Sequence, residues 1–221
     1  NRVVKAKLVP EKEINVSFVG KYTELKDSYK SINEALEHAG IKNKAKVNIN
    51  FVEAENINPR NIYTTLKNAD AILVPGGFGS RGIEGMILAC KFARENNIPY
   101  LGICLGMQVA IIEYARNVLK LKNANSTEFD HKTKYPVIGL ITEWSDRSGK
   151  KEKRDKNSDI GGTMRLGGQL CVLKRKSNSY KMYKKIEIVE RHRHRYEVNP
   201  KYKDDMIKSG LDVVGTSIDG K

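Results

Sequence analysis

The sequence Gly-Ile-Cys-Leu-Gly occupies residues 102–106, at the junction of two different hydrophobic patterns. The apolar run at residues 100–103 is short and predicts a buried strand. After it, apolar residues recur at helical spacing from Met107 to Ala115. A buried strand followed at once by a helix is one unit of a parallel α/β sheet. The tight turn between them would place Cys104 beyond the carboxyl end of the strand.

The same alternation fills the amino-terminal half of the chain. Short apolar runs predict strands at residues 14–19 and 71–74, and alternation of apolar and polar residues predicts one at 47–52. Helical patterns follow them, at residues 29–39, 57–66 and 86–93. Apolar strands that alternate with helices are typical of parallel βαβ units, because both faces of such a sheet are covered. We therefore expect residues 14–118 to form an α/β fold with a doubly wound, mostly parallel sheet.

The pattern changes after Asn123, where strands and long polar loops replace it. The clearest strands are predicted at residues 137–141 and 169–174, and the charged stretch at 145–160 predicts a mobile loop. We favour one α/β domain whose later strands extend or cover the sheet. A two-domain division near residue 120 is the alternative.

Composition narrows the class of protein. The chain has 221 residues, of which 39% are hydrophobic and 30% charged. No apolar run approaches the roughly 18 residues of a transmembrane span, so we expect a soluble globular protein with no membrane partner. A formal net charge of +14 invites a nucleic-acid function, but many basic residues are Lys scattered with Asn. They lack the glycine and aromatic interleaving of a single-strand binding surface, so a solvated surface is favoured, with anionic small molecules such as nucleotides left open.

The cysteines and the first residues indicate the cellular compartment and whether the sequence is part of a longer chain. Cys90, Cys104 and Cys171 are odd in number and lack CxxC spacing. They therefore favour reduced thiols and a cytoplasmic protein. The sequence begins at Asn1 without an initiator Met or a signal-peptide pattern, so we expect a domain that belongs to a longer polypeptide.

Residues 102–106 follow the pattern G-x-C-x-G, the thiol version of a nucleophile elbow. The flanking glycines relieve crowding around a strained turn. The helix that starts after Cys104 directs its positive end at the sulfur, which favours a thiolate and a developing oxyanion. The alternative is a small buried cysteine where chain elements pack closely, and the strand-turn-helix context favours the nucleophile.

A second glycine segment, which we name the glycine loop, reads Pro-Gly-Gly-Phe-Gly-Ser-Arg-Gly at residues 75–82 and follows a predicted strand. Ligands of doubly wound sheets bind outside the carboxyl ends of the strands. Residues without side chains at that edge can present backbone N–H groups to an oxyanion. A phosphate-binding loop is the alternative, disfavoured because the chain lacks G-x-x-x-x-G-K-[ST]. A glycine loop without any ligand is the third interpretation.

The sequence Arg-His-Arg-His-Arg at residues 191–195 is also unusual. In an extended strand its three arginines share one face, and His192 and His194 share the other. Two histidines alone are a poor zinc site because no third ligand cluster is visible, so we expect no metal. A solvated basic strand and a site for an anion both remain open.

At this point the motifs resemble a known family. Gly-Gly-Phe-Gly at residues 76–79, followed by Gly-Ile-Cys-Leu-Gly-Met-Gln at residues 102–108, resembles the class I, or triad, glutamine amidotransferases. Further segments at residues 20–22, 27–31, 123–129, 161–167 and 190–199 narrow the resemblance to the glutaminase domains of CTP synthases. The resemblance extends over essentially the whole chain.

The resemblance implies hydrolysis of glutamine through a cysteinyl-glutamyl thioester. The ammonia would pass to a synthase domain that aminates ATP-activated UTP to CTP. The residues implied for the site are Cys104 as nucleophile, the backbone N–H groups of Gly77 and Leu105 as oxyanion donors, and Phe78, Gln108, Glu128 and Arg195 as substrate-binding residues. Arg154 matches a position linked to allosteric activation by GTP.

The same resemblance implies partners outside this chain. Residues 1–13 would be a linker from a preceding synthase domain, and residues 14–221 the amidotransferase domain without its carboxyl-terminal closing segment. This domain itself would need no cofactor, since ATP, Mg²⁺ and UTP belong to the synthase domain. The full-length enzyme would be a cytoplasmic homotetramer with no nucleic-acid partner.

One element of the family pattern is missing. The family base is a His two residues before a Glu, in a His-Pro-Glu segment, and none of His38, His131, His192 and His194 matches it. We expect that the segment carrying the base is omitted, and that a chain ending at Lys221 turns glutamine over weakly. A catalytically silent regulatory domain that senses glutamine or nucleotides is the alternative. A thiol hydrolase acting on peptides or γ-glutamyl amides is another.

Overall fold

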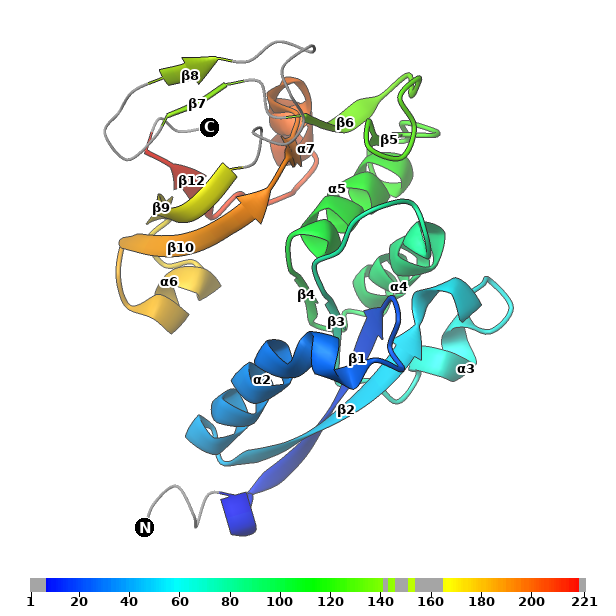
Figure 1. Ribbon diagram of the computed structural model, residues 1–221, viewed down its shortest axis with the longest axis vertical. Coiled ribbons are helices and arrows are strands. Elements are labelled where there is room, and N and C mark those ends of the chain that lie inside the picture. The colour runs from blue at the N-terminus through cyan, green and yellow to red at the C-terminus, as the bar shows by residue number, and fades with distance from the viewer. Residues whose placement is uncertain (1–6, 141–142, 146–150, 154–164, 219–221) are drawn as a thin grey trace. The chain divides into compact units, whose positions relative to one another are not determined.

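The computed structural model describes residues 7–140, 143–145, 151–153 and 165–218. The chain divides into two compact units, residues 1–113 and 114–221, which can be followed by colour in Figure 1. The division lies inside helix α5 (Leu105–Asn117), close to the position where the sequence pattern changes.

The first unit contains the predicted parallel sheet. Its strand order is β2-β1-β3-β4, and every neighbouring pair is parallel. The strands are β1 (Lys12–Gly20), β2 (Ala45–Glu53), β3 (Ala71–Val74) and β4 (Tyr100–Gly102). These strands confirm the four predicted from apolar runs, with ends that differ by a few residues.

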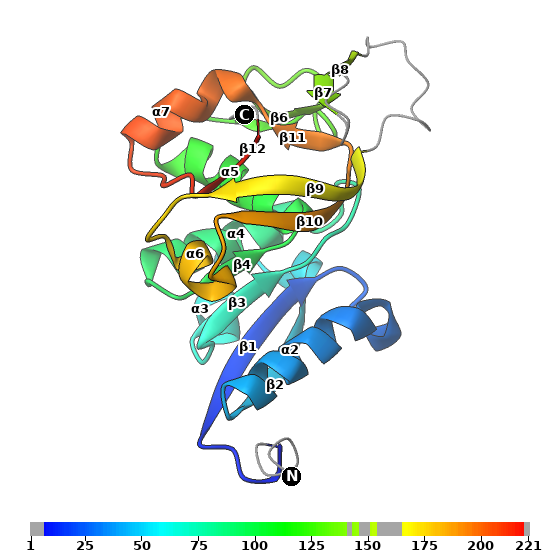
Figure 2. The same cartoon turned by 90° about the vertical axis from the view of Figure 1, so that its left-hand side faces the viewer.

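Helices cover both faces of this sheet, as Figure 2 shows. The helices are α2 (Lys30–Lys42), α3 (Ile62–Leu66), α4 (Ile83–Glu95) and the first part of α5. The chain leaves β1 toward one edge of the sheet and leaves β3 toward the other, so right-handed crossovers place α2 and α4 on opposite faces. The point where the strand order reverses therefore lies between β1 and β3, and ligands of such sheets bind at that point.

Aromatic packing on β1 anchors the core of the first unit. The Phe18 side chain is fully buried, and its ring lies 4.7 Å from Tyr29 and 5.1 Å from Phe51, measured between ring centroids. Tyr29 comes from the short 3-10 helix η1 (Lys26–Tyr29) that leads into α2. The loop after β1 is therefore fixed to the sheet by the same residues that fill the core.

The helix predicted at residues 57–66 is wrong at its beginning. A short 3-10 turn, η2 (Ala54–Asn56), comes first, and regular helix begins only at Ile62. Pro59 disfavours helical backbone at Asn58, the residue before it. The side chain of Asn61 then accepts a hydrogen bond from the Asn58 N–H at 2.9 Å, and the Asn58 side chain accepts one from the Arg60 N–H at 3.0 Å. These local bonds replace the helical ones.

The second unit is built from smaller sheets. Its strand orders are β10-β9-β12, β11-β6-β5 and the pair β7-β8. The strands are β5 (Asn125–Ser126), β6 (Pro136–Leu140), β7 (Glu143–Ser145), β8 (Lys151–Lys153), β9 (Arg165–Leu173), β10 (Glu187–His194), β11 (Tyr196–Val198) and β12 (Gly215–Ser217), and the helices are α6 (Asn178–Tyr183), the 3-10 turn η4 (Pro200–Tyr202) and α7 (Lys203–Lys208). Strands β6 and β9 confirm the two that the sequence indicated most clearly.

The charged stretch predicted as a mobile loop is partly a strand. Residues 151–153 form β8, which pairs antiparallel with β7, so the loop prediction is wrong there. Residues 146–150 and 154–160 of this stretch lie outside the described part of the chain.

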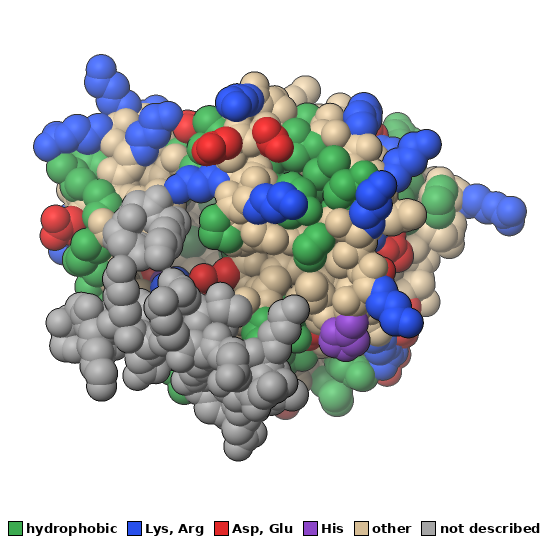
Figure 3. Space-filling model, turned by 90° about the horizontal axis from the view of Figure 1, so that it is seen from above, with side chains coloured by type: hydrophobic (Ala, Val, Ile, Leu, Met, Phe, Trp, Pro, Cys, Tyr) green, Lys and Arg blue, Asp and Glu red, His purple; other side chains and the backbone are tan. Residues whose placement is uncertain are grey.

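On the face drawn in Figure 3, Lys and Arg side chains lie at several places and acidic side chains lie among them. None of the described helices combines the length and the apolar character needed to cross a bilayer.

Close packing of α4 on η2 generates a testable prediction. A Cβ on Gly85 would lie 1.8 Å from the carbonyl oxygen of Ala54, so Gly85→Ala must push the helix away from the turn. We expect the free energy of unfolding to fall by about 2 kcal/mol, measured by urea denaturation. Gly139→Ala is the control, because no heavy atom lies within 4 Å of a Cβ there. Equal stabilities of the two variants would contradict this packing.

Candidate active site

Cys104 lies in a strained turn between β4 and α5. Its φ is +53°, in the left-handed region that residues with side chains rarely adopt. Neither neighbouring glycine has room for a side chain. A Cβ on Gly102 would lie 2.4 Å from the carbonyl carbon of Gly106, and a Cβ on Gly106 would lie 2.1 Å from the Val74 carbonyl oxygen. The predicted elbow is therefore present, and only glycine fits on either side of it.

Backbone hydrogen bonds hold this turn at the edge of the sheet. The Ile103 N–H donates to the Val74 oxygen at 2.9 Å, which continues the pairing of β4 with β3. The Gln108 N–H then donates to the Cys104 oxygen at 3.1 Å, in the first turn of α5. Because α5 begins directly after Cys104, the positive end of its helix dipole favours a thiolate at this position.

A polar cluster around the buried Glu113, close to the turn, was not identified from the sequence. The Tyr100 hydroxyl donates to the Gly106 carbonyl at 2.8 Å. Arg94 holds the buried Glu113 carboxylate through two nitrogens at 2.8 to 3.1 Å. Burial, reinforced by the nearby Cys90 and Glu113, raises the pKa of the Tyr100 phenol. No motif marks these residues, since each is recognisable only once α4, β4 and α5 are packed together.

The glycine loop converges on the cysteine. A Cβ on Gly76 would lie 3.5 Å from the Cβ of Cys104, and one on Gly77 would lie 3.2 Å from Cδ2 of Leu105. The two glycine segments therefore meet at the carboxyl ends of β3 and β4. Phe78, expected in a pocket wall, is 61% exposed, whereas Gln108 is buried at 4%.

The spacing of the glycine loop also matches a dinucleotide-binding motif, because residues 77–82 read G-x-G-x-x-G. In a dinucleotide site, an acidic residue about 20 residues further on holds the ribose. Here β4, the strand that follows, ends at Gly102 and is continued by Ile103 and Cys104. The acidic partner is missing from that position, so the dinucleotide interpretation is disfavoured.

Lys21 was also not identified from the sequence. It follows β1 directly and is only 5% exposed. Its ammonium donates to the carbonyl oxygens of Phe78 at 2.8 Å and Gly79 at 2.6 Å. A lysine immediately after a buried strand, at the point where the strand order reverses, was the available signal.

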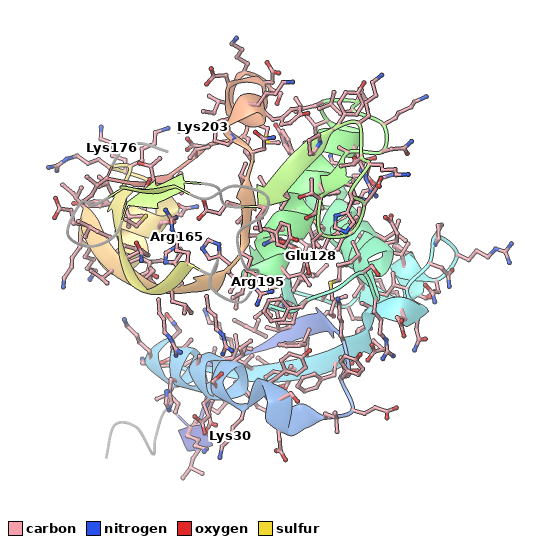
Figure 4. The ribbon with its side chains drawn as sticks, turned by 45° about the horizontal axis from the view of Figure 1, so that its top comes forward. Lys30, Glu128, Arg165, Lys176, Arg195 and Lys203 are labelled. Atoms are coloured by element: carbon pink, nitrogen blue, oxygen red, sulfur yellow. The ribbon has the colours of Figure 1, made fainter. Side chains whose placement is uncertain are left out.

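The other expected substrate residues belong to the second unit. Glu128 follows β5, and its N–H donates to the buried Ser126 hydroxyl at 3.1 Å. Arg195 occupies the bend between β10 and β11. Burial raises the pKa of the Tyr196 phenol, the Glu128 charge raises it further and the Arg195 charge opposes this. Both charges therefore lie close to Tyr196, and Figure 4 shows the Glu128 and Arg195 side chains next to one another.

The predicted common face of three arginines is wrong for Arg195. Along β10 the expected alternation holds, with Arg191 and Arg193 exposed. The strand ends at His194, and the bend turns the next side chain inward. The Nε atom of Arg195 is buried and, among the described residues, has no hydrogen-bond partner. A buried guanidinium nitrogen of this kind suits an anionic ligand.

His192 and His194 do share a face, with ring centroids 5.1 Å apart. Glu197 binds Arg165 at 2.7 Å, and Nδ1 of His194 lies 3.7 Å from the same carboxylate oxygen. Because Arg165 already pairs with this carboxylate, the carboxylate does little to stabilise a protonated His194. Nowhere in the described ranges do three or more His, Cys, Asp or Glu side chains form a group that could hold a metal.

The Cys90 and Cys171 thiols, which we expected to serve packing, lie in less reactive surroundings than Cys104. Burial raises the pKa of Cys90 to about 12 and also raises that of the Cys171 thiol. Both therefore suit packing better than catalysis. Arg154 lies outside the described residues.

Known proteins resemble this chain in sequence and structure. The family model for class-I glutamine amidotransferases matches residues 24–221. Among solved structures, the glutaminase domain of CTP synthase from Trypanosoma brucei with bound acivicin is 37% identical, with a TM-score of 0.80. The match covers 92% of this chain and 75% of that chain.

The three thiols are expected to differ in reactivity. Iodoacetamide at neutral pH should alkylate Cys104 at least about tenfold faster than Cys90 or Cys171, because only Cys104 stands at a helix N-terminus and burial keeps the others protonated. Peptide mapping by mass spectrometry measures the three rates, with Cys104→Ser as the control. Alkylation of Cys90 at the rate of Cys104 would contradict the assignment.

The lowered pKa of His194 predicts that the free energy of unfolding depends on pH. Burial, then the charges of His192 and Arg165, lower its pKa from 6.5 to about 4. Between these values the unfolded chain takes up a proton that the folded chain refuses, so stability falls as the pH decreases through this window.

Urea denaturation at about pH 7 and about pH 4.5 tests this, with His194→Gln as the non-titrating control. The unchanged chain should lose about 2 kcal/mol more than the variant, because carboxylate effects are common to both. Equal losses would show that His194 does not carry this pH dependence.

Proposed function

Since the chain belongs to the class-I glutamine amidotransferase family, we propose that it hydrolyses glutamine to glutamate and ammonia through a thioester on Cys104. The observation that carries the proposal is the strained elbow at Cys104 with the glycine loop beside it. A nucleophile on a left-handed turn at a helix N-terminus, facing backbone N–H groups, suits acyl transfer.

The reaction begins when the Cys104 thiolate attacks the γ-carbonyl carbon of glutamine. The carbonyl electrons move to oxygen, and the N–H groups of Gly77 and Leu105 donate to that oxyanion. Collapse of this intermediate forms the thioester and expels the amide nitrogen, which leaves as ammonia after receiving a proton. Water then attacks the thioester, releasing glutamate and restoring the thiol.

The amino-acid end of glutamine would be held by groups of both signs. Arg195 would bind the α-carboxylate, for which its buried Nε is suited, and Glu128 would accept from the α-ammonium. Gln108 and Phe78 would complete the substrate site. Acivicin, the glutamine analogue bound in the Trypanosoma brucei domain, supports a glutamine site in this fold.

The ammonia would serve a synthase domain that aminates ATP-activated UTP to CTP. ATP, Mg²⁺ and UTP would bind in that domain, because this chain has no G-x-x-x-x-G-K-[ST] sequence. GTP would act as an activator through the segment that contains Arg154. A cytoplasmic, homotetrameric full-length enzyme belongs to the same proposal.

The general base would come from outside these residues. Family members use a His two residues before a Glu, and no histidine of this sequence has that setting. None of the histidines in residues 1–221 is therefore assigned as the base. The second candidate function is a regulatory domain that binds glutamine or nucleotides without catalysis, and a complete polypeptide without the His-x-Glu pair would favour it.

Ammonia release from glutamine tests the proposal. We expect the purified protein, with its ends defined by intact mass, to release ammonia. Cys104→Ser should lower kcat by about 1,000-fold or more, because a serine hydroxyl ionises far less readily than a cysteine thiol. Cys171→Ser is the matched control and should leave the rate unchanged.

The length of the polypeptide separates the two candidates. A chain that ends at Lys221 should react about 100- to 10,000-fold more slowly than one that carries the base. Full activity from the shorter chain would contradict the placement of the base. A longer chain that binds glutamine without releasing ammonia would favour the regulatory domain.

A further inference from the structure

We propose that Lys21 is a positioning residue for the oxyanion site: its buried ammonium fixes the glycine loop, so that the Gly77 N–H stays directed at the carbonyl bound to Cys104. This inference rests on the proposed glutaminase function. It concerns contacts within residues 1–113, which form one compact unit.

The backbone that carries Lys21 is itself firmly held. The Tyr29 hydroxyl donates to the Lys21 carbonyl at 2.5 Å, and the Tyr29 ring packs on Phe18 in the core. The Glu53 carboxylate, at the end of β2, accepts from the Thr23 N–H at 2.9 Å and from the Tyr22 N–H at 3.2 Å. The backbone at Lys21 is thus held by Tyr29 and, through the next two residues, by the end of β2.

At its other end, the ammonium holds two consecutive carbonyls. The oxygens of Phe78 and Gly79 both accept from Nζ. Two successive carbonyls can turn toward one cation only where the residue between them leaves the extended conformation, and Gly79 has a φ of +74°. The lysine therefore selects one conformation of the loop two residues after Gly77.

A second contact between the segment after β1 and the glycine loop is weaker and lies at the surface. Arg81, near the end of the glycine loop, pairs with Glu55 at 2.6 Å and stacks on the Tyr22 ring at 4.4 Å. These side chains are more than 40% exposed, so the ion pair contributes little. Lys21 makes the buried contact between the segment after β1 and the glycine loop.

Stability alone does not call for a lysine at this position. Burying an ammonium has a desolvation cost, and an apolar side chain of similar length would fill the space without it. What the apolar side chain cannot do is hold the two carbonyls. The lysine is therefore assigned to loop geometry, and its removal should affect the step that needs an oxyanion.

Two reactions of Cys104 separate loop geometry from general damage. Glutamine hydrolysis passes through an oxyanion, whereas alkylation by iodoacetamide displaces iodide at a saturated carbon and forms none. Misplacing the Gly77 N–H should therefore slow the first reaction and spare the second. It should also lower kcat more than it changes KM, because the oxyanion exists only in the transition state and the intermediate.

The experiment compares Lys21→Met, Lys21→Arg and the control Lys12→Met in the full-length protein. Lys12 begins the same strand and is exposed. We expect Lys21→Met to lower kcat by about 10- to 100-fold, with KM and the alkylation rate changed by less than about threefold. Lys21→Arg, which retains N–H donors, should recover part of the loss, and Lys12→Met should match the unchanged protein.

The outcomes distinguish this inference from the proposed function. If the unchanged protein releases no ammonia, the proposed function fails first. If it does, and Lys21→Met keeps its kcat or loses alkylation and hydrolysis in parallel, the positioning role is wrong. Should Lys21→Met not fold, Lys21→Gln is measured by the same criteria. If neither folds, Lys21 serves stability and the assignment is overturned.

Discussion

At Cys104 the backbone adopts a left-handed conformation that is unfavourable for a residue with a side chain. The turn persists because both neighbours lack a Cβ and because the sheet, through Val74, leaves no space for any other residue at Gly106. This one constraint decides where the sulfur lies: beyond the carboxyl end of β4 and before the first turn of α5. The strain stays local, while the surrounding strands and helices supply the packing that maintains it.

The rest of the first unit holds partners around that sulfur. The Tyr100 hydroxyl donates to the Gly106 carbonyl at the start of α5, and the Lys21 ammonium donates to the Phe78 carbonyl in the glycine loop. Each donates from a part-buried side chain to a backbone carbonyl of the segments that flank Cys104. An oxyanion site made of backbone requires this kind of support, because no side chain rotamer can correct a displaced N–H.

Much of this could be predicted from the sequence, because it depends on local patterns. Apolar runs of four to six residues marked the strands, and glycines at residues 102 and 106 marked the elbow. The helix proposed from residue 57 failed because Pro59 and the side chain of Asn61 compete with helical bonds. Arg195 was placed on the wrong face because a bend ends β10, and Lys21 and Tyr100 were missed because their partners are more than five residues away in sequence. Such contacts arise from packing, which periodicity does not reveal.

The central claim is that Cys104 carries the γ-glutamyl group during turnover. Rapid acid quenching of the protein with glutamine, followed by peptide mass mapping, tests it most directly. The account predicts that the peptide containing Cys104 gains the mass of glutamine less ammonia, and that alkaline hydroxylamine removes it as expected for a thioester. Ammonia release with an unmodified Cys104 peptide, or with the acyl group on another residue, would contradict the account.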